Sequence, residues 1–186
     1  MIRTLVTVAA LTAGLSSLAA AHAGLQTIEA PAGSQYRAVI SIPHGCAGAA
    51  TNEVRVRVPD GMIAINPMPK AGWELETVME PLDEPYMDHG REVTERIGEV
   101  RWTGGDLADA HYDEFTFMAR LPNEPGQHLH FPVVQACGDD ALRWIDVPAS
   151  GEGAADTDYP APVLYLTEPE SSGHSHGHDH GHSHDH

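Results

Sequence analysis

Short apolar stretches that alternate with polar residues set the strongest limit on how this chain of 186 residues can fold. This alternation is typical of strands that bury one face. The clearest examples run over 36–42, 54–58, 73–77 and 115–119. Turn residues end several stretches, as at Pro59-Asp60-Gly61 and Gly104-Gly105. We find no convincing helical period over ten residues, so the sequence predicts an all-β fold.

Three further segments complete the predicted set, and one more is weaker. They run over 93–102, 129–135 and 143–147, with a short edge strand over 163–166. Many short strands separated by turns in a single stretch of chain predict an antiparallel β-sandwich of the Ig-like or Greek-key type. We therefore expect the sandwich to occupy residues 22–148, followed by a linker over 149–173 that is rich in Gly, Ala, Pro and acidic residues.

The first 21 residues have the features of a secretory signal peptide. Arg3 gives a positive start, an apolar run follows from Leu5 to Leu18, and Ala19-Ala20-Ala21 offers small residues for cleavage. The run is too short for a stable membrane span, and no later segment is longer. We expect an exported, periplasmic protein with no membrane span in its mature form.

Two cysteines, Cys46 and Cys137, are predicted to form a disulfide, because export places them in an oxidising compartment. In the loop-entropy account such a bridge stabilises the fold by roughly 4–5 kcal/mol. The alternative is a thiolate site for Cu(I), for which the pair lacks CxxC spacing.

The chain is strongly acidic, with 27 Asp and Glu against 10 Lys and Arg and a formal net charge of −17. This charge excludes binding to nucleic acid phosphates through bulk electrostatics. It suits the attraction of cations, although a charged surface more often serves solubility.

Cleavage after Ala21 would make His22 the new N-terminus. The α-amine and the imidazole of such a residue can chelate one metal ion, and both lose their protons readily near neutral pH. Two nitrogens in one plane suit Cu(II), and a third ligand completes a histidine brace. Ala21-His22-Ala23 is also a cleavage motif, and cleavage after Ala23 would discard the histidine, so both positions remain open.

Several further elements accompany this histidine. They are Glu29-Ala-Pro-Ala-Gly-Ser34, Tyr36-Arg-Ala-Val39, the strand and turn from Val54 to Gly61, Pro67-Met-Pro-Lys-Ala-Gly-Trp73, Asp113-Glu-Phe-Thr-Phe117, Pro132-Val-Val-Gln135 and Arg143-Trp-Ile145. On these residues the chain resembles the YcnI-like family of exported copper-binding domains, DUF1775, from His22 to about Pro148. The resemblance implies a β-sandwich in which a brace at the N-terminal histidine, a glutamate and a nearby tryptophan hold copper. His22 matches the histidine and Trp144 the tryptophan.

The family's glutamate has no clear counterpart here. The matching stretch reads Pro43-His44-Gly45-Cys46, so we predict His44 as the third ligand, against the simpler interpretation of a surface loop histidine. Glu53 is a weaker candidate, because its parity with Arg55 places it on the solvent face of its strand.

Trp144 would be read as a core residue from its strand position alone, whereas the resemblance places its indole beside the metal. Gln135 is a candidate for a supporting amide near the site. His128 and His130 have ligand-compatible spacing on one strand face, but we expect them to be surface residues.

The last thirteen residues, 174–186, carry a histidine at every second position and are predicted to be disordered, because they cannot form a core. The histidines are His174, His176, His178, His180, His182, His184 and His186. We interpret this tail as a native binder of copper, zinc or nickel.

The sequence thus predicts a non-enzymatic copper-binding protein that sequesters Cu(II) or delivers it, its partner being a copper exporter, importer or cuproenzyme. Two alternatives remain: a copper-dependent oxidative enzyme of the histidine-brace type, and a general Cu, Zn or Ni buffer that acts through the tail. The sequence has no HExxH motif and no phosphate-binding glycine loop that would indicate a hydrolase.

Overall fold

The alternating segments form the strands of a two-layered β-structure. A computed structural model describes residues 22–169, which contain strands and loops and no helix; no helix in this range could therefore cross a membrane. The strands are β1 (Gly24–Leu25), β2 (Glu29–Pro31), β3 (Gln35–Ile42), β4 (Thr51–Arg57), β5 (Ile63–Pro67), β6 (Glu74–Asp88), β7 (Arg91–Leu107), β8 (Asp113–Arg120), β9 (His128–His130), β10 (Val133–Cys137), β11 (Asp140–Trp144) and β12 (Val163–Thr167).

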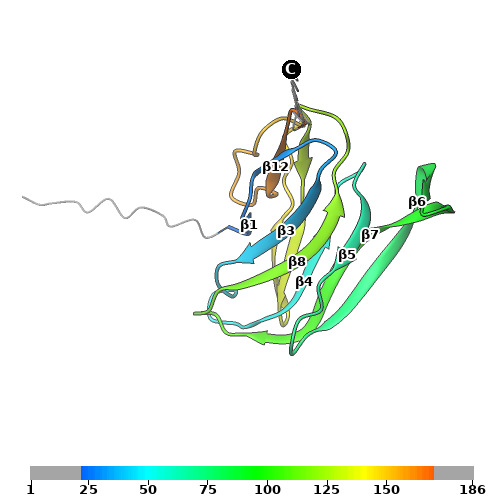
Figure 1. The fold of residues 1–186 in the computed structure, drawn as a ribbon. Helices are drawn as coiled ribbons and strands as arrows, with labels where there is room; N and C mark the ends of the chain where they lie inside the picture. Colours follow the sequence, from blue (N-terminus) through cyan, green and yellow to red (C-terminus); the bar gives the residue numbers. More distant parts are fainter. Residues whose placement is uncertain (1–21, 170–186) are drawn as a thin grey trace, which may run out of the picture.

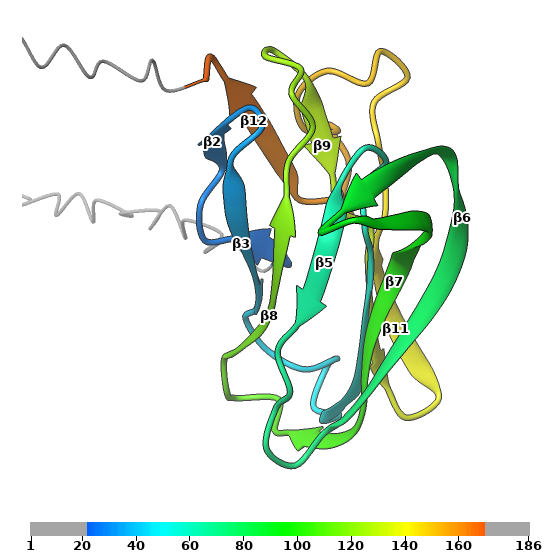
Figure 2. The same cartoon turned by 45° about the vertical axis from the view of Figure 1, so that its right-hand side comes forward.

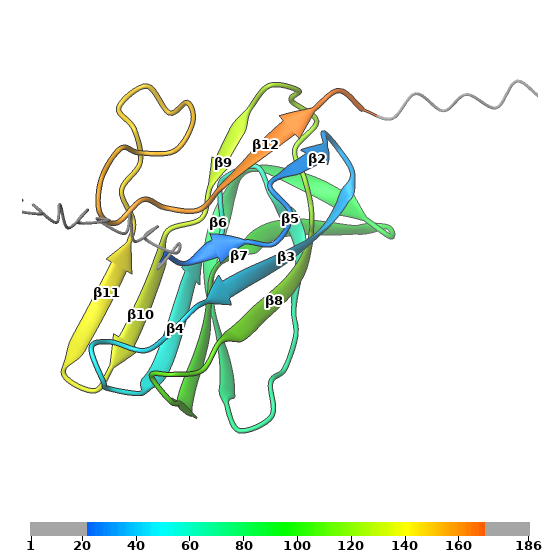
Figure 3. The ribbon, with the colours of Figure 1, turned by 90° about the vertical axis from the view of Figure 1, so that its left-hand side faces the viewer.

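Two larger sheets form the layers of the sandwich. One has the order β1-β3-β8-β5 and the other β11-β10-β4-β7-β6, and both are antiparallel throughout. A third sheet, β2-β12-β9, lies at one end of the molecule (Figure 3). The predicted all-β antiparallel sandwich is therefore confirmed.

The core lies between the layers, as the period-two pattern predicts. Ala38, Ile40 and Ile42 of β3 are fully buried, while Arg37 on the same strand is exposed. Aromatic rings fill the centre, where Trp102 of β7 lies 5.4 Å from Phe115 of β8 between ring centroids. Alternation along each strand thus decides which side chains leave water, and their burial provides the main driving force for folding.

The hairpin of β6 and β7 is much longer than its alternating segments predict, and it projects from the body of the molecule (Figure 1). Strand β5 was not predicted. Its alternation is interrupted because Ala64 has a positive φ of 52° and the pairing with β8 shifts between Ile63 and Asn66. Figure 2 shows β5 at the edge of its sheet beside β8.

The segment 129–135, predicted as one strand, is two strands in different sheets. Strand β9 pairs with β12, and β10 pairs with β4 and β11. Pro132 lies between them, and because it has no amide hydrogen it cannot continue a ladder. The strand predicted over 143–147 also begins and ends earlier, as β11.

The short strand expected at 163–166 exists, but its predicted place at an edge and outside the sandwich is wrong. Strand β12 lies between β2, with which it is parallel, and β9. Val163, Leu164 and Leu166 are all buried, which explains why the segment is a nearly continuous apolar run. The fold therefore extends through Thr167, and within the described part of 149–173 the linker character is confined to the loop before β12.

Candidate metal centre

His22 lies at the start of the described chain, and the residues after it are fixed to the sandwich. Ala23 is buried, Gly24 pairs with Ser41 of β3, and the Gln26 amide donates to the Val39 carbonyl at 3.1 Å. The imidazole itself is exposed. Its ring centroid lies 5.2 Å from that of Trp144, which is the range of direct contact between aromatic rings. The fold thus brings His22 beside Trp144, the last residue of β11.

Trp144 is both a core residue and the neighbour of His22. It pairs with Val133, shares the inner face of its sheet and is 3% exposed. Its indole Nε1 donates to Gln135 Oε1 at 3.4 Å. The two interpretations of this tryptophan are therefore compatible, because the buried indole also contacts the exposed His22 ring.

Gln135 connects three parts of the molecule and has no exposed surface. Besides accepting from Trp144, it donates from Nε2 to the His44 carbonyl at 2.6 Å and to Thr51 Oγ1 at 2.8 Å. A buried amide is stable only when such partners are present. Gln135 therefore fixes the His44 backbone relative to the Trp144 indole.

The predicted disulfide between Cys46 and Cys137 is present, with 5.9 Å between the Cα atoms and a sequence separation of 91. It joins the loop after β3 to the end of β10. Thr51 Oγ1, which contacts Gln135, lies 3.6 Å from Cys137 Sγ. The bridge therefore belongs to the same buried cluster that supports Trp144.

The loop that carries His44 is held tightly on both sides. The Gly45 amide donates to the Asp109 carbonyl at 3.1 Å. A Cβ atom at Gly45 would lie 2.1 Å from the Ala49 carbonyl oxygen, so only glycine fits there. The backbone of His44 is thus positioned by Gln135 on one side and by this close approach on the other.

The half-buried His44 ring is oriented by its own loop. Its Nδ1 lies 2.5 Å from the Gly45 carbonyl, and because a carbonyl only accepts, Nδ1 must carry the hydrogen. Nε2 then keeps its lone pair, the arrangement that metal-ligating histidines adopt. Residues 22–169 contain no group of three or more His, Cys, Asp and Glu side chains arranged to hold a metal ion. His44 as the third ligand therefore stays a prediction.

Glu53 lies on the other face of its sheet. It pairs with Ala136, whereas Val54 pairs with Gln135, and opposite residues share a face. Its Oε1 lies 3.0 Å from Arg55 Nε. The sheet thus separates Glu53 from Trp144, in agreement with its solvent-facing parity. The signal segment 1–21 and the seven tail histidines, His174 to His186, lie outside the described residues.

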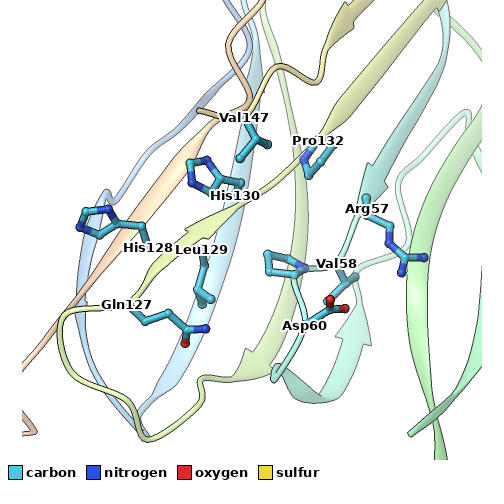
Figure 4. Close-up of a pocket in the computed structure, with 10 residues that line it drawn as sticks. Arg57, Val58, Asp60, Gln127, His128, Leu129, His130, Pro132 and Val147 are labelled. Atoms are coloured by element: carbon cyan, nitrogen blue, oxygen red, sulfur yellow. The ribbon is translucent and has the colours of Figure 1, made fainter. Parts of the chain in front are cut away.

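His128 and His130 hold a loop rather than forming a group with His22. His128 Nδ1 accepts from the Gly153 amide at 2.7 Å, and His130 Nε2 donates to the Gly151 carbonyl at 3.0 Å. They line an open pocket of about 310 Å³, together with residues that include Arg57. Figure 4 shows both histidines on β9 and Arg57 across the pocket.

Two residues near the site were missed by the sequence analysis. Thr51 bridges Gln135 and the disulfide, and Tyr159 packs on Trp144 with 5.3 Å between ring centroids. Tyr159 lies in the predicted linker, and no pattern in the sequence marks it. A bridge between Asp146 and Pro160, at the two ends of the β11–β12 loop, holds it near the indole.

Comparison with known proteins identifies the kind of domain. The family described as "Domain of unknown function (DUF1775)" matches residues 22–166. No curated protein matches the sequence. A crystal structure of an uncharacterized protein from Nocardia farcinica, described as having an immunoglobulin-like fold, is similar at a TM-score of 0.58 and 20% identity, covering 78% of this chain and 98% of that one.

The solution structure of CaCohA2 from Clostridium acetobutylicum covers 78% of this chain and 90% of its own, at 8% identity. Its TM-score of 0.41 is too low for the likeness to bear on this fold. The similarity to the Nocardia protein supports the immunoglobulin-like arrangement of the sandwich and concerns the fold alone.

Proposed function

The chain belongs to the DUF1775 family, and from this premise we propose that it is a periplasmic protein that binds one Cu(II) ion at His22. The ion is then sequestered, or exchanged with a copper exporter, importer or cuproenzyme. The observation that carries the proposal is the position of His22, whose exposed imidazole is held against the buried Trp144 where the fold begins.

The donor chemistry at this position fits Cu(II). After cleavage at Ala21, His22 offers an amine and an imidazole nitrogen, and Cu(II) has the highest affinity of the first-row divalent ions for such nitrogen donors. Among the described residues the His22 ring makes no hydrogen bond, so its nitrogens are available. Trp144 covers one side and limits the approach of water. His44 Nε2 or a water molecule would complete the coordination plane.

Binding and transfer, rather than catalysis, is the role we propose. An oxidative enzyme acting on a polymer would need a flat, exposed aromatic surface around the metal. Trp144 is 3% exposed, and the exposed Tyr159 ring packed on it is tilted by 46°, so the two rings do not form one. The adjoining loop is fixed by Gln135 and the disulfide, which suits a preformed binding site.

The proposal is tested with the mature protein lacking residues 174–186, so that tail histidines do not contribute. Competition titration should show one tightly bound Cu(II), and His22→Ala should abolish it. His111→Ala is the matched control, because His111 is an exposed histidine in the loop before β8. Equal copper binding by both variants would contradict the proposal. Intact mass of the exported protein checks that His22 is the first residue.

The tail-based alternative gives the opposite pattern. If the tail alone binds metal, the truncated protein retains no copper, and His22→Ala has no effect in the full-length mature chain. The two functions are therefore distinguished by the same pair of titrations.

A further inference from the structure

Three aromatic rings are in contact in the order His22, Trp144, Tyr159. The His22 and Trp144 centroids are 5.2 Å apart, and those of Trp144 and Tyr159 are 5.3 Å apart. The interplanar angles are 55° and 46°. Trp144 is buried, and Tyr159 is 44% exposed. Tryptophan and tyrosine are the side chains most readily oxidised by one electron, and contact between rings allows rapid electron transfer.

We propose that Trp144 and Tyr159 form an electron-transfer path that carries an oxidising equivalent from a copper ion at His22 to the protein surface. This inference rests on the proposed function for the ion itself. The path from Trp144 to Tyr159 depends only on the described side chains.

The surroundings of the two rings give the path a direction. The Trp144 indole N–H points at the Gln135 amide oxygen, which is a very weak base in a fully buried position. An oxidised Trp144 therefore keeps its proton and stays a strong oxidant. The exposed Tyr159 can release its phenol proton to water as it gives up an electron. Oxidation consequently moves outward, from the indole to the phenol.

The backbone holds Tyr159 in this position. The Asp146 amide donates to the Tyr159 carbonyl at 3.1 Å, and the Ala161 amide donates to the Asp146 carbonyl at 2.9 Å. Asp146 follows Trp144 by two residues, so these bonds tie the Tyr159 segment to the chain that leaves the indole. The contact between the rings is thus built into the β11–β12 connection.

The phenol also faces an accessible hollow. An open pocket of about 400 Å³ is lined by Ala141, Arg143, Ile145, Asp146 and Tyr159. A small reductant can reach Tyr159 there and restore it.

The reaction that the path serves is the encounter of Cu(I) with hydrogen peroxide. Peroxide takes one electron from Cu(I) and one from Trp144, its O–O bond breaks, and two hydroxide ions form. Trp144 regains its electron from Tyr159, whose phenol proton neutralises one hydroxide. The products are Cu(II), one hydroxide, one water and a tyrosyl radical, which the reductant then returns to tyrosine. The ligand His22 escapes oxidation.

The first test uses the metal-free, full-length mature protein. Laser photo-oxidation of tryptophan should be followed by the rise of a tyrosyl absorption as the tryptophan radical decays. Tyr159→Phe should remove most of that rise. Tyr112→Phe, which removes an exposed tyrosine on another loop, should leave it unchanged. An undiminished rise in Tyr159→Phe would overturn the path whether or not copper binds.

The second test adds one equivalent of copper, ascorbate and peroxide to the same full-length protein, and maps oxidation by peptide mass spectrometry. The tail and His22 lie in different peptides and are read separately. Tyr159 should be oxidised more than Tyr112, and Tyr159→Phe should increase damage to His22 and Trp144. Trp144→Phe should abolish the excess at Tyr159.

Tyr159 oxidation no greater than that of Tyr112, with copper bound at His22, would refute the proposal. If titration shows no copper at His22, the proposed function is refuted instead. The photochemical test uses the metal-free protein and therefore still tests the path from Trp144 to Tyr159. Tyr159→Phe keeps the ring that packs on Trp144 and removes only the hydroxyl of a half-exposed side chain, so this variant should fold. The path can therefore be tested with Tyr159→Phe even if Trp144→Phe fails to fold.

Discussion

Replacing Gln135 with leucine removes the one amide that joins Trp144, the His44 loop and the disulfide cluster. Leucine is close to glutamine in size and fills the space without a large cavity. The change therefore isolates the hydrogen bonds. It leaves the His44 carbonyl and the Thr51 hydroxyl without their partners at 2.6 and 2.8 Å. The Trp144 indole N–H loses its bond at 3.4 Å as well.

The expected cost follows from these three groups. A buried polar group that loses its partner costs about 1–3 kcal/mol. The Trp144 bond is long and adds little, and Thr51 retains a weak contact with Cys137 Sγ at 3.6 Å. We therefore expect Gln135→Leu to lower the free energy of unfolding by about 2–4 kcal/mol. With a urea m-value of about 2 kcal/mol per molar, the midpoint should fall by about 1–2 M.

Equilibrium urea unfolding of the oxidised mature protein, followed by tryptophan fluorescence, measures this cost. Gln26→Leu is the control, because Gln26 is exposed and its described bond uses only the backbone amide. That variant should stay within about 0.5 kcal/mol of the wild type. A similarly small loss in Gln135→Leu would show that the amide does not hold the His44 loop and Trp144 together.

Three further predictions follow from the same structure. Thiol titration of the unfolded, unreduced protein should find no free thiol, and reduction of Cys46–Cys137 should cost about 4–5 kcal/mol; free thiols would reopen the Cu(I) alternative. Burial raises the pKa of Tyr36, whose hydroxyl donates to the Thr27 carbonyl at 2.6 Å. The contribution of the Tyr36 phenol to the free energy of unfolding is therefore complete below the unfolded pKa of about 10, and it is lost as the pH rises above that value. Tyr36→Phe should therefore flatten the fall in the free energy of unfolding at alkaline pH. An equally steep fall in the variant would contradict this. Electron paramagnetic resonance of the tail-deleted Cu(II) protein should show two coupled imidazoles, reduced to one by His44→Ala; an unchanged spectrum would exclude His44 as a ligand.

Most of the fold could be predicted from the sequence because one face of each strand is apolar and the other is polar, which produces an alternating pattern. Alternation located β3, β4 and β8 closely. It failed where another constraint acted: Pro132 divides one segment between two sheets, and a positive φ at Ala64 disrupts β5. The place of β12 depends on a parallel pairing with β2, more than 130 residues earlier in the chain, and no local pattern encodes such a partner.

The candidate site was readable only in part. The disulfide was predicted from the expected oxidising compartment, and the disulfide itself is confirmed. His22 and Trp144 were named through the resemblance, and they are in contact. Thr51 and Tyr159 were missed because their roles arise from packing and backbone hydrogen bonds between segments far apart in sequence. The orientation of the His44 ring likewise depends on a tight loop around Gly45.

The central claim is that the α-amine of His22 is a copper ligand, and adding one glycine ahead of His22 tests it most directly. The extended protein, without residues 174–186, keeps every side chain and converts the amine into an amide. Competition titration should then show a sharp loss of Cu(II) affinity compared with the protein that starts at His22, with unchanged urea stability in the absence of metal. Equal affinity in the two proteins would contradict the account.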